Sequence, residues 1–462
     1  MSSPSPTLSR SPWPTFVLCA LGAYVTALDL SIVNVAFPEI LRRFKATRAD
    51  VSWIVTTYNI FFGSLLVIAG KTADQLGRRR LFRIGVSIFG LGSALCAFAP
   101  SLILLVAGRA IQGIGGALLV PATLGLLLAA FPIEKRTQIV AMWGGIGALG
   151  VASGPSLGSV LITLTNWRAA FAVNLPICIA MIVFSGVYLA ETARVRTASR
   201  PDYVGAVFIT IALASLALGI SRSDVWGWID ARTLGSLILA IVCVPIFIAR
   251  QRRHPEPVLD LTLFRSRSFS VANLAALAFY AGFAALGLNN VLFLRQVWGY
   301  TILHAGLLSA LAPTTVAILA TFTGRLAGRI GFRPLLIAGP VVVAVGAAAF
   351  ALFLGRSPNP WLFVAGSEIV AVGIAMFLPV SSAAAVADLP PARLSVGGAV
   401  NNTARQVGSV LGIALLVAMI GSPQSASSLL QAHHRGYVLI AILVLLAAVV
   451  SIAQPSRTVT PR

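Results

Sequence analysis

The 462-residue sequence predicts an all-α membrane protein that crosses the bilayer many times. Hydrophobic residues make up 58% of the chain and charged residues only 10%, a balance far from that of a soluble domain. Apolar runs of about 20 residues, the length that a helix needs to cross the hydrocarbon core, recur along the whole chain. Because these runs are continuous and do not alternate with polar residues, they favour helices over the strands of a membrane barrel.

Fourteen such runs follow one another, separated by short segments that contain charged residues or proline. They cover residues 15–37, 51–70, 81–99, 102–124, 139–161, 169–190, 203–221, 233–250, 269–293, 303–323, 334–355, 361–381, 397–420 and 437–454. An even number of spans places both termini on the same side of the membrane. The loops on that side hold about twice as many Lys and Arg residues as the opposite loops, which predicts cytoplasmic termini and a cell (inner or plasma) membrane location.

The charge and the cysteines exclude several other classes of protein. The formal net charge is +21, but the cations lie between helices throughout the chain and form no single patch, which argues against nucleic-acid binding. The four cysteines stand alone in apolar runs without metal-ligand spacing, so we expect no metal and no cofactor. The first run continues past Asp29 without a cleavage site and is therefore interpreted as a span, not as a signal peptide.

The chain contains an internal repeat. The loop Gly70–Arg80 returns in altered form 254 residues later as Gly324–Pro334, and the run Val106–Pro121 returns 258 residues later as Val364–Pro379. Two nearly equal offsets predict two parallel six-helix halves, residues 1–190 and 263–462, and an inserted two-helix hairpin with its flanking loops at 191–262. Transporters built from parallel repeats bind their substrates near the midplane between the halves.

Four segments carry a resemblance to a known family. They are Leu28–Pro38 (LDLSIVNVAFP), Gly70–Arg80 (GKTADQLGRRR), Arg109–Gly116 (RAIQGIGG) and Gly150–Gly158 (GVASGPSLG). In this order, and each at its own span, they resemble the major facilitator superfamily, specifically its fourteen-helix drug:proton antiporter branch, with Phe37 where Leu is usual. The resemblance covers nearly the whole chain. It implies a monomeric exporter, not an enzyme, that moves lipophilic small molecules by alternating access in exchange for protons.

Asp29 is the candidate proton-coupling residue. A charged Asp at the centre of a membrane helix costs about 2.5–3.5 kcal/mol on insertion scales, so it should face a cavity or a partner. Arg109 in the fourth run is the natural partner, and Gln112 shares its helix face. A fixed structural pair and a proton-coupling pair both satisfy this pattern, and a carboxylate whose burial and neighbouring cation change between conformations can load and release a proton. The family resemblance assigns proton exchange to Asp29.

Other polar residues inside the runs are candidates for substrate binding or a second proton site. These are Glu368, Asn34, Asn59, Gln112, Asn289, Asn290 and Asn402. Glu368 is the one further acid that we place inside the membrane, although it also has the position of a residue that reaches the outer interface. The amides either line a cavity or hold helices together.

The loop at residues 70–80 is a candidate conformational latch. Gly70 and Gly77 frame Asp74, and Arg78 and Arg79 follow directly. We expect Asp74 to meet a helix N-terminus or an arginine, whereas attraction to anionic lipids would explain the cations alone.

The fifth run is a candidate hinge. Gly150, Gly154 and Gly158 are spaced to permit close contact with another helix, and Pro155 bends a helix. The family resemblance associates this segment with antiporters.

Two other classes of function stay open. A proton-coupled symporter for uptake would share the fold, and only the resemblance of the fifth run argues against it. A membrane redox or ion-pumping subunit would need ligands, but we place His254, His433 and His434 in loops and His304 near the end of a span.

Overall fold

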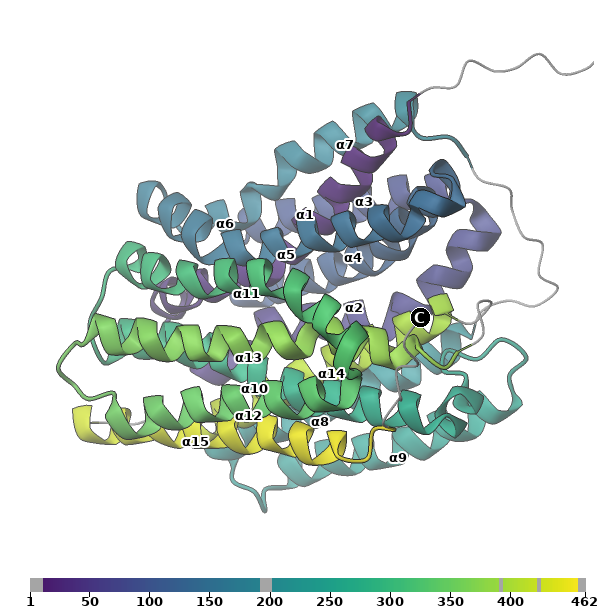
Figure 1. Cartoon of the computed structure of the whole chain (residues 1–462). Coiled ribbons are helices and arrows are strands. Elements are labelled where there is room, and N and C mark those ends of the chain that lie inside the picture. Colours follow the sequence, from purple (N-terminus) through teal and green to yellow (C-terminus); the bar gives the residue numbers. More distant parts are fainter. Residues whose placement is uncertain (1–10, 192–201, 390–393, 422–424, 456–462) are drawn as a thin grey trace, which may run out of the picture.

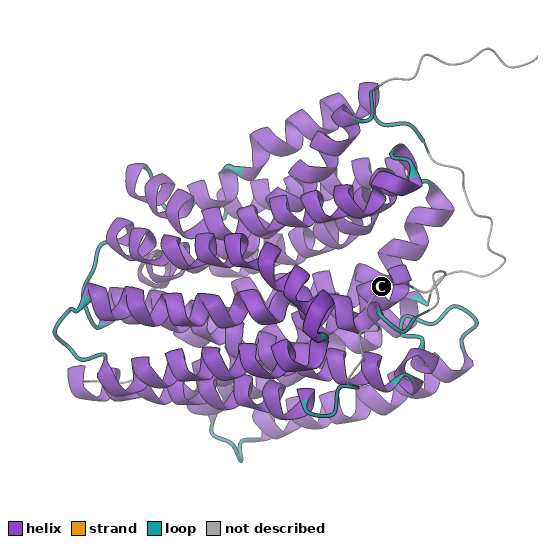
Figure 2. Ribbon diagram, in the orientation of Figure 1, coloured by secondary structure: helices purple, strands orange, loops and turns teal. Residues whose placement is uncertain are grey.

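The computed structural model describes residues 11–191, 202–389, 394–421 and 425–455, and these residues form helices without a strand (Figures 1 and 2). The first part of the chain contains α1 (Trp13–Phe44), α2 (Arg48–Leu76), α3 (Arg78–Ala97), α4 (Leu102–Ala130), α5 (Ile133–Leu164), α6 (Ala169–Ala172), α7 (Asn174–Tyr188), α8 (Tyr203–Trp226) and α9 (Ala231–Arg253). The second contains η1 (Leu261–Arg265), α10 (Arg267–Gln296), α11 (Ile302–Ile330), α12 (Phe332–Phe353), α13 (Pro360–Val386), α14 (Leu394–Ile420) and α15 (Ala426–Ser451).

The number of membrane spans agrees with the prediction. In the described residues, 13 spans are long and apolar enough to cross a bilayer, and α6 and α7 together form one of them. The bent helix α5 is the fourteenth if its two parts are counted as one span. The last predicted run begins too late, because α15 already starts at Ala426. His433 and His434 therefore lie in a helix, and their placement in a loop was wrong; each histidine has a hydrogen-bond partner that allows it to sit inside the bundle.

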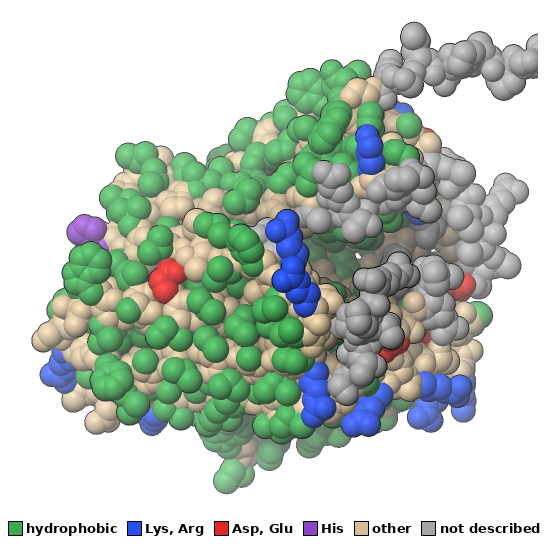
Figure 3. Space-filling view, viewed as in Figure 1, with side chains coloured by type: hydrophobic (Ala, Val, Ile, Leu, Met, Phe, Trp, Pro, Cys, Tyr) green, Lys and Arg blue, Asp and Glu red, His purple; other side chains and the backbone are tan. Residues whose placement is uncertain are grey.

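The helices lie side by side along one direction, with both ends of the described chain at the same end of the bundle (Figure 1). Helices α1–α7 form one group and α10–α15 another, and the groups meet where α2 packs along α14 and α5 along α11. The space-filling view shows apolar side chains over the middle of the molecule, whereas most of the visible Lys and Arg residues gather at the end that carries the termini (Figure 3). This distribution suits a protein whose middle lies in lipid.

The hairpin of α8 and α9 lies at the edge of the bundle. Helix α8 contacts α2 and α14, whereas α9 packs mainly on α8. Polar contacts join this region to α2 at three heights: Arg222 pairs with Asp50, the Thr210 hydroxyl donates to Ser64 Oγ at 2.8 Å, and Lys71 pairs with Glu256 at 2.7 Å. The contacts with α14 that we identify are apolar, as around Val410. The hairpin is therefore bound more specifically to α2 than to α14.

Asp202 anchors the start of the hairpin. Its carboxylate accepts hydrogen bonds from the Gly205 N–H at 2.8 Å, from Arg250 Nε at 2.6 Å and from Gln251 Nε2 at 3.0 Å. Burial by itself raises the pKa of Asp202, but these hydrogen bonds outweigh it and hold the pKa below its ordinary value. The contribution of the carboxylate to stability is therefore present above pH 4 or so and is lost only as the pH falls through the lowered pKa.

The two turns that follow α2 and α11 are equivalent in the internal repeat. Gly77 ends α2 with φ 98° and Gly331 ends α11 with φ 83°. Side chains rarely adopt positive φ, so these one-residue turns require glycine. Gly331 lies 254 positions after Gly77, the same offset that the sequence repeat shows between the two loops.

Helix α5 has the close contact and the bend that the sequence predicts. A Cβ at Gly150 would lie 2.5 Å from the Tyr24 carbonyl oxygen, one at Gly158 would lie 2.6 Å from Ile32 Cγ1, and one at Gly154 would overlap Ser31. These glycines thus form the seam between α5 and α1. The helix bends by 41° between Val151 and Ser153, where Pro155 on the next turn disturbs the backbone four residues before it.

Replacing one glycine of this seam should weaken the packing of α5 on α1. We expect Gly154→Ala to lower the melting temperature, because the added methyl group meets Ser31 and the backbone nitrogen of Ile32 3.0 Å away. Gly144→Ala on the same helix is the matched control, since its Cβ meets no atom within 4 Å. Thermal unfolding of the purified protein in detergent measures both. Equal melting temperatures for the two variants would contradict the assignment of Gly154 to a tight seam.

Candidate functional site

Asp29 lies on α1 and is fully buried, with 0% of its surface exposed. Its Oδ2 atom forms an ion pair with Arg109 of α4. Its Oδ1 atom accepts hydrogen bonds from Gln112 Nε2 and Asn174 Nδ2, both at 3.0 Å. The structure therefore confirms the predicted pairing with Arg109 and shows a carboxylate whose two oxygens are both occupied, as a charge buried in an apolar bundle requires.

Arg109 is held from several sides. It is fully buried; its Nε donates to the Ile54 carbonyl at 2.8 Å and its Nη1 donates to Gln112 Oε1 at 2.8 Å. The guanidinium lies 4.2 Å from the ring centroid of Tyr58, close enough for a cation–π interaction. Among the described residues, neither Arg109 Nη2 nor the Tyr58 hydroxyl has a hydrogen-bond partner. Arg109 thus has one unused donor, and the Tyr58 hydroxyl is also unused.

Gln112 connects the ion pair to α3. Besides its bonds to Asp29 and Arg109, its Nε2 donates to Ser93 Oγ at 2.6 Å, and Asn174 Nδ2 lies 3.4 Å from the same hydroxyl. Ser93, Gln112 and Asn174 are each fully buried. A polar network contributed by five helices, α1, α2, α3, α4 and α7, thus lies within the N-terminal group. Protonation of Asp29 would remove its charge and weaken the hold on Arg109, which is the chemical change that the arrangement permits.

The amide candidates fall into two groups. Asn34 on α1 lies at the boundary between the groups, because a Cβ at Gly287 of α10 would be 3.8 Å from its Nδ2. Asn289 is fully buried inside the C-terminal group, where its Oδ1 lies 2.7 Å from His433 Nδ1. Asn290 accepts a hydrogen bond from the Tyr437 hydroxyl at 3.0 Å. Asn34 is thus the one of these three placed between the groups, whereas the other two join α10 to α15.

The remaining candidates have no hydrogen bond to the Asp29 network in the described part of the chain. Asn59 on α2 is buried and its Oδ1 has no partner within the described chain. Asn402 on α14 is half-buried, next to Thr403, whose hydroxyl donates to the Gly63 carbonyl at 2.9 Å and so joins α14 to α2. Glu368 is half-buried on α13, on the side that also bears the exposed Trp361. The structure does not bring Glu368 to Asp29.

The expectation of a loop at residues 70–80 was wrong, because this segment is the end of α2, the one-residue turn at Gly77 and the start of α3. A Cβ at Gly77 would lie 2.5 Å from Glu191 Oε1, which accepts a hydrogen bond from the Arg79 N–H at 3.2 Å. Arg78 Nη1 donates to the Gly125 carbonyl of α4 at 2.8 Å. Gly70 has more room, since its Cβ would approach only Pro121, at 3.9 Å. The side chain of Asp74 lies outside what the structure describes, so its expected latch contact stays a prediction.

The two groups are joined at the end of the bundle opposite the termini. Arg48 at the start of α2 donates to Gln296 Oε1 of α10 at 2.7 Å and to the Gly421 carbonyl after α14 at 3.0 Å. At the same end, a Cβ at Gly306 of α11 would lie 2.6 Å from the Pro155 carbonyl oxygen of α5. The bundle is therefore tightly closed at this end.

Removing Arg48 should loosen this end. We expect Arg48→Ala to lengthen and broaden the distance between spin labels at the exposed positions Leu164 and Ser357, because two hydrogen bonds between the groups are lost. Pulsed electron paramagnetic resonance in nanodiscs measures that distance. Arg43→Ala, which removes an exposed arginine one residue before the end of α1, should leave the distance unchanged. The same distribution in Arg48→Ala and wild type would show that Arg48 does not hold the groups together.

Sequence reasoning missed Asn174, Ser93 and Arg48. Asn174 is an amide inside an apolar run. The same signal selected Asn34, so the sequence could have indicated Asn174. Ser93 and Arg48 gave no signal, because serine is common in membrane helices and Arg48 lies among loop cations. No group of three His, Cys, Asp or Glu side chains suited to a metal occurs in the described residues.

Comparison with known proteins agrees with this architecture. The chain is 31% identical over 421 residues to the multidrug resistance protein Stp of Mycobacterium tuberculosis (strain CDC 1551 / Oshkosh), covering 91% of this chain and 78% of that protein. It is 31% identical over 424 residues to the tetracenomycin C resistance and export protein of Streptomyces glaucescens, with the same coverage of 91% and 78%. It is 30% identical over 409 residues to the methylenomycin A resistance protein of Streptomyces coelicolor (strain ATCC BAA-471 / A3(2) / M145), covering 87% and 84%.

A solved structure and a family model complete the comparison. A bacterial homologue of the human drug peptide transporters PepT1 and PepT2 superposes with a TM-score of 0.66 at 16% identity, covering 96% of this chain and 98% of that chain, which shows a common fold. The model of the Major Facilitator Superfamily matches residues 19–413 and 272–461. The chain therefore belongs to the major facilitator superfamily and is a multi-pass membrane transporter, not an enzyme.

Proposed function

We propose that the protein is a proton-coupled exporter of lipophilic small molecules, with Asp29 as the residue that binds and releases the proton. The observation that carries this proposal is a fully buried carboxylate held by one cation and two amides from other helices. Arg109 offsets the charge of this carboxylate in the structure, and a conformation that separates the two side chains would leave the carboxylate oxygens available to a proton. The unused Nη2 of Arg109 and the unused Tyr58 hydroxyl supply groups for a second arrangement of the network.

The proposed cycle moves the two helical groups against each other. Residues 1–190 and 263–462 act as the two halves, and the hairpin within 191–262 moves with α2, to which its polar contacts bind it. In this cycle both termini lie in the cytoplasm, so the end closed by Arg48 faces outward. The glycine seam of α5, its bend near Pro155 and the segment 70–80 with Asp74 govern the change to the outward-facing arrangement.

The substrate class rests on the relatives and on the charges available. Three relatives are named for resistance to drugs or antibiotics, and one of them for export. The Asp29 network is occupied by its own partners, so the polar surface for a substrate comes from amides such as Asn34. We therefore propose neutral or weakly charged lipophilic compounds. The transporter works as a monomer in the cell membrane.

Transport in proteoliposomes tests the proposal. Purified protein is reconstituted with a pH-sensitive dye in the lumen, and tetracenomycin C is added outside under an imposed pH gradient. An antiporter takes the compound into an acidic lumen and raises the lumenal pH as protons leave. Liposomes without protein are the control for passive permeation.

The direction of the gradient separates the alternatives. Accumulation driven only by an acidic exterior would establish symport and overturn the proposal of export. Accumulation that is equal under both gradients and moves no protons would show a uniporter.

A further inference from the structure

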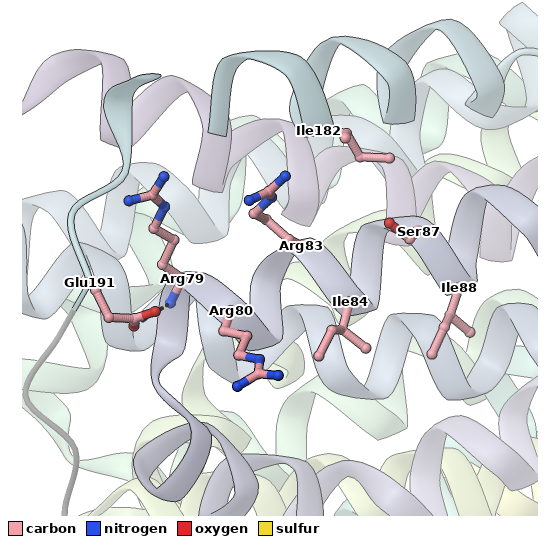
Figure 4. A pocket seen from close by; sticks show the side chains of 8 residues that line it. All are labelled: Arg79, Arg80, Arg83, Ile84, Ser87, Ile88, Ile182 and Glu191. Atoms are coloured by element: carbon pink, nitrogen blue, oxygen red, sulfur yellow. Dashed lines mark hydrogen bonds between the residues drawn. The ribbon is translucent and has the colours of Figure 1, made fainter. Parts of the chain in front are cut away.

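A pocket separate from the Asp29 network lies between α3 and α7, at the end of the bundle that carries the termini (Figure 4). Its volume is about 590 Å³. The N-terminal part of α3 contributes most of its lining, and Ile182 of α7 and Glu191 after α7 contribute the rest. The pocket opens on the outer surface of the N-terminal group, so it belongs to neither the ion pair nor the contact between the groups.

The lining changes from charged to apolar along α3. Two rows of side chains at four-residue spacing face the pocket: one row is Arg79, Arg83 and Ser87, and the other is Arg80, Ile84 and Ile88. Figure 4 shows Arg79 and Arg83 extending from α3 toward α7, on the side where Ile182 lies. At a rise of 1.5 Å per residue, the distance from the first arginine to the last isoleucine is about 13 Å along the helix.

The charged end of the pocket has an excess of positive charge. Arg79 Nη2 donates to the Gly186 carbonyl at 2.8 Å, and its N–H donates to Glu191. Arg80 and Arg83 have no hydrogen bond or ion pair with any described residue, and Glu191 is the one acid in the lining. The first turn of α3 contains no acid, so the positive end of the helix dipole adds to the arginines. An anion in the pocket would offset these like charges.

We propose that this pocket binds an anionic phospholipid of the surrounding leaflet. Its phosphate lies at the charged end of the pocket, with Arg83 on the α7 side and Arg80 on the other side of α3 (Figure 4). Each guanidinium group can donate two hydrogen bonds to the phosphate when its side chain turns toward it. One acyl chain follows Ile84 and Ile88 toward the middle of the membrane and contacts Ile182 of α7. Basic pockets between membrane helices bind anionic headgroups in this way, and the apolar end of the pocket favours a lipid over a free phosphate ion.

Native mass spectrometry of the delipidated full-length protein tests the proposal. Dioleoyl phosphatidylglycerol and dioleoyl phosphatidylcholine are titrated separately into wild type and into Arg80→Gln/Arg83→Gln. The matched control is Arg252→Gln/Arg253→Gln, which removes two exposed arginines from the end of α9 on the same side of the membrane. We expect the first phosphatidylglycerol to bind on the order of tenfold more weakly to the pocket variant, and with unchanged affinity to the control. Wild type should prefer it over phosphatidylcholine.

Two further measurements separate a lipid from a free anion. Ile88→Gln should weaken the same binding event without changing any charge, and excess inorganic phosphate should not displace the lipid. An equal loss in the two double variants would overturn the proposal in favour of diffuse attraction to a basic surface. Displacement by phosphate together with an unaffected Ile88→Gln variant would make it an inorganic anion site. If Arg80→Gln/Arg83→Gln is not monodisperse, the affinities of the single variants Arg83→Gln and Arg253→Gln for phosphatidylglycerol are compared instead.

Discussion

Asp29→Asn is expected to abolish substrate-driven proton movement while leaving the helical bundle assembled. The amide has the size of the carboxylate and keeps hydrogen-bonding partners, but it cannot exchange a proton at any physiological pH. In the proteoliposome assay, the variant should lose accumulation of the compound under a pH gradient by about two orders of magnitude, the scale of removing a positioned acid–base group. Exchange of labelled for unlabelled compound without a gradient should continue, because exchange needs no net proton transfer.

Two variants in this network distinguish a loss of proton exchange from a loss of structure. Asp29→Glu keeps a titratable group and should retain coupled transport at a reduced rate, whereas Ser93→Ala removes a neighbour of the network without changing its charge and should keep full coupling. Normal coupling in Asp29→Asn would mean that the buried ion pair is purely structural. Loss of exchange as well as coupling would mean that the variant no longer cycles, and Asp29 would then be required for the conformational change itself.

Arg109→Gln is expected to lower stability more than any other single change in the network. It leaves the Asp29 carboxylate fully buried without a cation, and breaking a buried ion pair from one side costs about 3–5 kcal/mol. It also removes the hydrogen bond to the Ile54 carbonyl and the stacking on Tyr58. Thermal unfolding followed by size-exclusion chromatography with fluorescence detection measures the loss as a lower melting temperature.

The double variant Asp29→Asn/Arg109→Gln completes a thermodynamic cycle. With both charges gone, no unpaired charge remains buried, so we expect the double variant to melt at a higher temperature than Arg109→Gln alone and a coupling energy of about 0.5–3 kcal/mol. Strictly additive effects would show that the two side chains do not interact energetically, in conflict with their ion pair. A double variant that is stable and cannot couple protons would separate the structural from the chemical role of the pair.

The spans and the ion pair are the parts that sequence reasoning could predict. A run of about 20 apolar residues forms a helix across lipid whatever its neighbours are, so local composition decides where spans lie. A charged residue inside such a run needs a partner, and only a few oppositely charged residues are available within the spans. This is why Asp29 could be matched with Arg109 before any geometry was known.

The polar surroundings of the pair could not be predicted with the same method. Asn174 was not selected, although the same signal selected Asn34, Asn289 and Asn290. An amide in an apolar run does not reveal which way it faces, so this signal could not distinguish the amide that meets Asp29 from the others. In the structure, Asn174 meets Asp29, whereas Asn289 and Asn290 face α15. The misplacement of His433 has a similar cause, since a histidine with a buried partner does not interrupt a membrane helix.

The sequence by itself determined the class of protein, the approximate spans, the internal repeat and the two charges that must meet inside the membrane. Each of these depends on the chemistry of residues that are neighbours along the chain or on a rule that holds for any residue in lipid. Tertiary structure alone decided that Asn174 and Ser93 complete the site, that Arg48 closes one end, and that Arg80 and Arg83 share a pocket with isoleucines. Those contacts depend on the rotation and tilt of helices from distant parts of the chain, which local hydropathy does not specify.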